Sequence, residues 1–146
     1  MNIVIFLQNA WSPVYAGRKW PRQSWLRALS TSRSGQRLTA LTDDFNECEN
    51  TTEEVADHPD GICQPDPQHI GRVLKARKPK VVIACGKQAE KAISAAWSGP
   101  LIVVPHPACR VVTTAAYLKA QSLITESFIG RVAIRQKRGG LELIDL

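Results

Sequence analysis

Three runs of apolar residues along the chain predict the strands of a parallel sheet. Residues 2–7, 80–85 and 100–104 are almost continuously apolar and rich in Val and Ile, instead of alternating between apolar and polar positions. Continuous runs are typical of strands that are buried on both faces, as in parallel sheets covered by helices. A fourth, shorter run at 141–144 predicts a short last strand.

Helical patterns separate and follow these strands. Asp66 and Pro67 form a strong helix start, because Asp caps free backbone N–H groups and proline fits the first helical position. Trp25 lies on the apolar face of the helix that Pro21 opens. Four segments have apolar side chains at helical spacing: 21 to 30–35, 67–77, 87–97 and 112–128.

Strands and helices in alternation predict an α/β fold, a three-layer α/β/α sandwich around a mostly parallel four-stranded sheet. At 146 residues the chain has room for one core, so residues 1–146 are expected to form a single domain. Right-handed crossovers put the loops after the first three strands at one edge of the sheet, where open α/β folds bind ligands. We therefore expect four residues to converge there: Gln8, Asn9, Gly86 and His106.

His106 is the most distinctive residue of this edge. It lies between two prolines, Pro105 and Pro107, directly after the third strand. The prolines fix φ on both sides and withhold two backbone donors, so the imidazole is expected at a rigid strand end. The alternative interpretation is a turn that has no chemical role.

An acidic segment at 43–65 interrupts the pattern of strands and helices. It holds eight of the chain's 13 Asp and Glu residues and no Lys or Arg. We expect a long acidic loop with little regular structure beyond a strand end at 41–45 and a turn of helix at 52–56. A loop of this length inside a small domain is usually functional or mobile.

The charge of the chain favours an anionic partner. Lys and Arg number 19 against 13 Asp and Glu, a formal net charge of +6, which favours nucleic acid. Residues 14–42 interleave basic and aromatic side chains, as do surfaces that contact phosphates and stack bases. Both features also fit an ordinary basic surface with Trp25 in the core.

No apolar run is long enough to span a membrane, and the apolar stretch at the N-terminus is too short for a signal peptide. We therefore expect a cytoplasmic protein that does not bind membranes. The same sequence argues against several chemistries. The single glycine at position 86 lacks the spacing of a phosphate-binding P-loop, and no G-x-G-x-x-G is present.

Cysteine and metal chemistry fit the sequence less well than the histidine site does. Cys85 or Cys109 paired with His106 would make a nucleophile, but a cysteine that ends an apolar strand is usually a small core residue. The spacings of four potential zinc ligands fit no common zinc module: Cys48, His58, Cys63 and His69. We predict no metal and no cofactor.

Three segments together are similar to motifs of the uracil-DNA glycosylase superfamily. They are QNAWSP after the first strand, PKVVIACGKQA around the second and PLIVVPHPACR around the third. The superfamily has a G-Q-D-P or G-I-N-P motif in the first place, an LGxxA turn in the second and an H-P-S-type motif in the third. The resemblance implies a uracil-DNA glycosylase-like fold. It also implies a protein that flips a uracil-like or modified pyrimidine base out of DNA and hydrolyses its N-glycosidic bond.

The resemblance implies roles for single residues. Asn9 falls where the family positions the hydrolytic water, with Gln8 beside it in the base pocket. Trp11 takes the place of the residue that inspects the 5-substituent of the base. His106 corresponds to the histidine that hydrogen-bonds the carbonyl of the departing base, and Arg110 lies on the loop that enters the minor groove. These roles fit a reaction in which the sugar becomes cationic and the base anionic.

The first motif departs from the family pattern. Leu7 and Ala10 replace its Gly and Pro, and Asn9 is a weaker base than Asp, so hydrolysis is expected to be slow. In iron–sulfur branches of the family a base-reading Asn precedes a cluster cysteine by four residues, and a second cysteine follows. Cys48 and Cys63 resemble that cysteine pair, but the further pair that completes a cluster is absent from the sequence. No cluster is therefore expected.

The same resemblance implies base-reading residues in the acidic segment. Asp44 stands four residues before Cys48, Phe45 offers a stacking face, and Asn46 is a second candidate reader. A carboxylate at position 44 favours bases that carry an amino group. A carboxylate that only caps the loop is the simpler interpretation.

We expect DNA as the partner of a monomeric protein. Four basic residues are the expected DNA contacts: Arg18, Lys19, Lys87 and Arg110. The main prediction is a monofunctional DNA N-glycosylase. The alternative is a catalytically inactive nucleobase- or DNA-binding module of the same fold, for example one that serves phage DNA modification or recognition.

Overall fold

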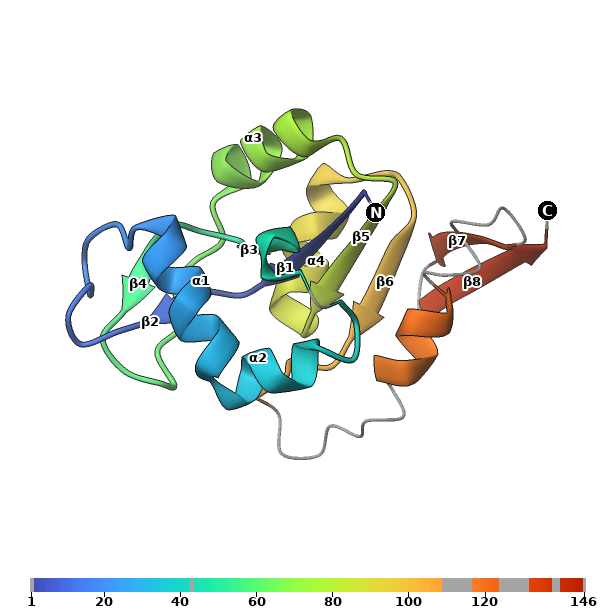
Figure 1. Cartoon of the computed structure of the whole chain (residues 1–146). Helices are drawn as coiled ribbons and strands as arrows, with labels where there is room; N and C mark the ends of the chain where they lie inside the picture. The colour runs from blue at the N-terminus through green and yellow to red at the C-terminus, as the bar shows by residue number, and fades with distance from the viewer. Residues whose placement is uncertain (1, 43, 109–116, 124–131, 138–139, 146) are drawn as a thin grey trace.

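A parallel four-stranded sheet is the centre of the molecule (Figure 1). The computed structural model describes residues 2–42, 44–108 and 117–123, and the backbone of 132–137 and 140–145. The strands follow the order β3-β1-β5-β6, and each neighbouring pair is parallel. They are β1 (Ile3–Leu7), β3 (Cys48–Asn50), β5 (Val81–Cys85) and β6 (Leu101–Val104). The predicted α/β class and the mostly parallel four-stranded sheet are confirmed.

Each face of the sheet carries its own hydrophobic core. Ile5 of β1 lies opposite Cys48 of β3 and Ile83 of β5, and Ile83 lies opposite Ile102 of β6. These four side chains belong to one core, whereas the alternate residues of the strands, such as Phe6, belong to the other. Both faces are therefore buried, which is why the strands are continuously apolar in the sequence.

Helices cover both faces of the sheet. Side chains of α1 (Arg22–Thr31) and α2 (Arg33–Leu38) pack into the core on the Ile5 face. Side chains of α3 (Pro67–Arg77) and α4 (Lys87–Ala96) pack into the core on the other face. This arrangement is compatible with the predicted three-layer sandwich.

The helix starts agree with the sequence signals. Asp66 accepts a hydrogen bond from the backbone N–H of Gln68 through Oδ1 (3.0 Å), and Pro67 is the first residue of α3. Pro21 directly precedes α1, as predicted. α1 ends where the extended Ser32 caps a second helix, α2, by accepting a backbone N–H through its Oγ. α2 is an element that the sequence did not predict.

The acidic segment contains regular structure, which corrects the expectation of a long irregular loop. It holds the short 3-10 helix η1 (Phe45–Glu47), β3, and β4 (Val55–Ala56), which pairs in parallel with β2 (Ala10–Trp11). The predicted strand end at 41–45 and helical turn at 52–56 are therefore wrong. Within this segment, β3 forms the edge strand of the central sheet beside β1, and β4 pairs with β2, which follows β1 in the chain.

β3 is difficult to predict because only one of its three residues is apolar. Its central residue, Glu49, has a side chain that is only 14% exposed. Burial raises the pKa of this carboxyl group, and neighbouring cations oppose that rise. Arg22 of α1 lies 2.7 Å from the carboxylate and Arg77 of α3 lies 3.6 Å from it. Glu49 therefore links the helices on the two faces of the sheet.

The strand predicted at 141–144 does not join the central sheet. Within the described backbone, β7 (Val132–Lys137) and β8 (Gly140–Asp145) form an antiparallel hairpin, which lies near β6 (Figure 1). β3 takes the fourth place instead, at the opposite edge. Of the helix predicted at 112–128, residues 117–123 are helical, and the remainder lies outside the described residues.

Removal of the charge of Glu49 tests whether this link stabilises the fold. We expect Glu49→Gln to lower the free energy of unfolding by about 1–3 kcal/mol, because two guanidinium groups lose a partly buried counter-ion. Glu54→Gln is the matched control, because Glu54 is an exposed carboxylate of the same segment without an ion pair among the described residues, and such surface substitutions change stability by less than about 0.5 kcal/mol. Urea unfolding measures both changes. Equal effects of the two substitutions would contradict the link.

Candidate functional site

A pocket of about 560 Å³ lies at the carboxyl ends of β1, β3 and β6, and we call it the strand-end pocket. Four residues of the predicted site line it: Gln8 and Asn9 after β1, Trp11 in β2, and His106 after β6. Residues 59–62 and side chains of α1 contribute further walls. The sheet order thus brings the first motif and the His-Pro turn to one cavity.

Three other elements hold the turn that carries His106. The Tyr117 hydroxyl donates to the carbonyl of the proline before His106 (2.7 Å), and the Arg37 guanidinium donates to the carbonyl of the proline after it. Gly86 has a φ of +91°, and a Cβ there would lie 3.3 Å from the Cβ of His106. Glycine at position 86 lets the two turns approach, so Gly86 and His106 converge as predicted.

The protonation state of His106 follows from its surroundings. The backbone N–H of Ala108 donates to Nδ1 of His106 (3.1 Å), so the proton of the neutral ring is on Nε2. Burial lowers the pKa of His106 below its ordinary value of 6.5. The imidazole therefore lines the pocket as a neutral group with one N–H donor.

Asn9 braces the wall of the pocket. Its Nδ2 donates to the carbonyl of Ala10 (3.0 Å) and to the carbonyl of Gly61 (3.1 Å). Its Oδ1 accepts the backbone N–H of Cys63 (3.1 Å). The amide thus joins the end of β1 to residues 61–63, and both of its donors are occupied by backbone carbonyls.

Asn50 is a pocket residue that the sequence did not reveal. It ends β3, next to the end of β1, and lines the strand-end pocket. Among the described residues its side-chain amide has no hydrogen-bond partner, whereas its backbone carbonyl lies 3.0 Å from Nε2 of His69. The signal for Asn50 is a polar residue at the carboxyl end of a strand, but that signal requires β3 to be recognised first.

The structure does not bring the three predicted base-reading residues of the acidic segment to this pocket. Asp44, Phe45 and Asn46 precede β3, so they lie at its amino end, whereas the pocket lies at its carboxyl end. The Asp44 carboxylate accepts the backbone and side-chain N–H groups of Asn46 (both 2.9 Å) and caps η1. Phe45 packs against the core.

The predicted DNA contacts lie in different surroundings. Arg18 is exposed, with its guanidinium 5.5 Å from the ring centroid of Tyr15. Lys19 forms an exposed ion pair with Glu53, and Lys87 is the exposed first residue of α4. Arg110 lies outside the described residues.

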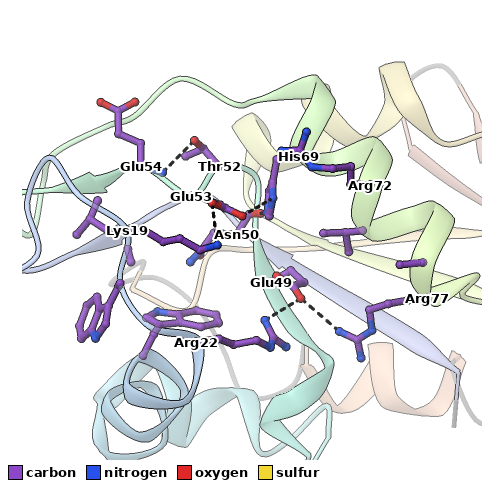
Figure 2. A pocket seen from close by; sticks show the side chains of 16 residues that line it. Lys19, Arg22, Glu49, Asn50, Thr52, Glu53, Glu54, His69, Arg72 and Arg77 are labelled. Atoms are coloured by element: carbon purple, nitrogen blue, oxygen red, sulfur yellow. Dashed lines mark hydrogen bonds and ion pairs between the residues drawn. The ribbon is translucent and has the colours of Figure 1, made fainter.

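A second pocket of about 350 Å³ lies between α1, α3 and the β3–β4 segment (Figure 2), and we call it the ion-pair pocket. Figure 2 shows that its charged side chains largely face one another. Glu53 lies 3.6 Å from Lys19 and 3.5 Å from Nδ1 of His69, and Glu49 lies between its two arginines. Asn50 lines both pockets and therefore forms part of the wall between them.

The described cysteines are poor nucleophiles. Burial raises the pKa of the Cys48 thiol to about 12, and burial also raises the pKa values of the Cys63 and Cys85 thiols. Cys109 lies outside the described residues. In the described part of the chain, no three His, Cys, Asp or Glu side chains gather in a way that would hold a metal ion.

Comparison with known proteins adds no assignment. No protein-family model matches the chain, and none of the curated proteins matches it. In the part of the chain that the structure describes, no helix has the length and apolar character required to cross a membrane.

The lowered pKa of His106 predicts how stability changes with pH. The unfolded imidazole takes up a proton near pH 6.5, whereas the folded one does so only at lower pH. Between these values the unfolded state binds more protons, so acidification favours unfolding. We expect the wild type to lose stability between about pH 7 and pH 5 more steeply than His106→Gln does. Urea unfolding across this range measures both slopes, and parallel slopes would contradict a buried neutral imidazole.

The brace formed by Asn9 predicts a local effect. Asn9→Ala removes the acceptor of the Cys63 N–H, so we expect that amide to exchange its hydrogen faster, with a stability loss of about 1–3 kcal/mol. Gln8→Ala is the control, because the Gln8 side chain makes one long hydrogen bond, to Gln88 (3.3 Å). NMR-detected hydrogen exchange measures the exchange rate of the Cys63 amide in both variants and in the wild type. An unchanged exchange rate at Cys63 would show that the brace does not hold the segment.

Proposed function

We propose that the chain is a monofunctional DNA glycosylase of the uracil-DNA glycosylase type. It takes up a uracil-like or modified pyrimidine base flipped out of DNA and hydrolyses its N-glycosidic bond. The observation that carries the proposal is the joint lining of one pocket by a neutral imidazole, His106, and an unpartnered amide, Asn50. The parallel four-stranded sheet with helices on both faces is compatible with the proposed uracil-DNA glycosylase-like fold.

The pocket suits a planar base. Trp11, Trp20 and Trp25 are among its lining residues and offer aromatic surface for stacking. The Asn50 amide carries both a donor and an acceptor, as does the imide edge of uracil, so the two form complementary hydrogen bonds. We therefore assign to Asn50 the base-reading role that the sequence alignment gave to Asp44.

His106 supplies the donor that the departing base needs. Cleavage of the bond between C1′ and the base leaves its electron pair on the base, whose carbonyl oxygen becomes more negative. The Nε2–H of His106 hydrogen-bonds that oxygen, and one such preorganised donor contributes about 3–4 kcal/mol to the transition state. A rigid turn suits this role because the donor needs no rearrangement during the reaction.

DNA remains the proposed partner. The formal net charge of +6 favours a polyanion, and exposed Arg18 and Lys87 offer contacts to phosphates. Arg110 is the residue proposed to contact the DNA groove. We propose that the protein acts as a cytoplasmic monomer without a cofactor.

One observation favours the second candidate function, a catalytically inactive module that binds a nucleobase in DNA. Both N–H donors of Asn9 are bound to backbone carbonyls and its Oδ1 accepts the backbone N–H of Cys63, so a hydrolytic water would compete with these contacts for the amide. A module of this kind would keep the pocket and the DNA contacts and lack turnover.

Base release from oligonucleotides separates the two candidates. Substrates carry uracil, mismatched thymine or a hydroxymethylated pyrimidine, and alkali converts abasic sites to strand breaks. We expect release of at least one base by the wild type, and a rate about 100- to 1,000-fold lower for His106→Ala. An oligonucleotide without a modified base is the control. Tight binding without release from any substrate would support the inactive module and refute the enzyme.

A further inference from the structure

The strand-end pocket has one acidic residue in its described lining. Of the described residues that line it, Asp60 is the only Asp or Glu, and none is Lys or Arg. N-glycosidic cleavage leaves positive charge on the sugar, and a nearby carboxylate would stabilise that charge. The resemblance to known motifs gave Asp60 no role.

The backbone around Asp60 is held on several sides. The N–H of Gly61 donates to the carbonyl of His58 (3.0 Å), and the N–H of Asp60 donates to Nδ1 of His58 (3.0 Å). A Cβ on Gly61 would lie 2.7 Å from the Cβ of Ala56, so the turn packs closely on β4. The Asn9 side chain binds the carbonyl of Gly61 and the backbone N–H of Cys63. These contacts fix the turn beside the end of β1.

The carboxylate of Asp60 is not used by this turn. Only the backbone N–H of Asp60 takes part in it, and among the described residues the carboxylate has neither a hydrogen-bond nor an ion-pair partner. The side chain is exposed, so water reaches it. A Pro-Asp-Gly sequence commonly forms a turn for backbone reasons alone. Here the same turn also places Asp60 in the lining of the pocket.

Asp60 and His106 line the pocket from different parts of the chain. Asp60 follows β4 and the edge strand β3, whereas His106 follows β6, the strand at the other edge of the sheet. If a base lies at the imidazole, its sugar must lie within reach of the Asp60 carboxylate for both groups to act on the breaking bond. Two groups placed in this way would act on the two halves of the breaking bond.

We propose that Asp60 is a catalytic carboxylate of this site and that Asn9 is a positioning residue that holds it. This inference rests on the proposed glycosylase function. A water oxygen forms a bond to C1′, and the bond between C1′ and the base nitrogen breaks with its electron pair moving to the base. Asp60 accepts the proton of the water, and its charge stabilises the cationic sugar. His106 donates its hydrogen bond to the base throughout.

Single-turnover base release from the best oligonucleotide substrate tests the role of Asp60. We expect Asp60→Asn to lower the rate about 100- to 10,000-fold, as for loss of a general base, with DNA affinity equal to or above that of the wild type. Asp57→Asn is the matched control, because Asp57 is an exposed carboxylate of the same segment outside the pocket lining and should keep the full rate. Asp60→Glu should retain more activity than Asp60→Asn.

Hydrogen exchange at the Cys63 amide separates chemistry from folding. Because the carboxylate makes no contact within the turn, Asp60→Asn should keep this amide as protected as in the wild type. A rate loss accompanied by faster exchange would assign Asp60 a structural role and overturn the inference. A wild-type rate for Asp60→Asn, with His106→Ala inactive, would overturn the inference and leave the glycosylase function in place. No release by the wild type from any substrate would overturn both.

Discussion

The ion pairs of Glu49 are the interaction on which the strand-end pocket depends. Arg22 and Arg77 allow a carboxylate to occupy the middle of an edge strand that has little apolar surface of its own. An unpaired carboxylate at this depth is costly to bury, so the two arginines favour the formation of β3. Because β3 pairs with β1, the chain after it begins at the same sheet edge as the first motif. Both Asn50 and the turn with Asp60 reach the pocket for this reason.

The sequence predicts the elements that are marked by a continuous apolar run or by a local signal such as a proline. β1, β5 and β6 are apolar runs, and the prolines beside His106 mark its turn. β3 has no such mark, because the partners that neutralise its carboxylate, Arg22 and Arg77, are 27 and 28 residues away. The site follows the same rule: Asn50 is recognisable only after β3 is known. The spacing between Asp44 and Cys48 favours Asp44 as a base reader, but spacing alone does not show that Asp44 lies at the amino end of β3, away from the pocket.

The protein separates its positive charge from its pocket. The formal net charge is +6, yet the described lining of the strand-end pocket contains no Lys or Arg, and its histidine is neutral. The two parts of a nucleotide differ in the same way, because the phosphate is anionic and the base is uncharged. A basic exterior with a cavity whose described lining holds no cation therefore matches a flipped nucleotide better than a basic cavity would.

The three hydrogen bonds of Asn9 also limit which amino acids position 9 accepts. An aspartate there has no N–H to offer, so it would bring a negative charge against the carbonyl oxygens of Ala10 and Gly61. An acidic residue introduced at position 9 would thus repel the wall of the pocket. A lineage with this brace gains a strand-end carboxylate only if residues 61–63 are rebuilt at the same time, so position 9 and this segment are expected to change together.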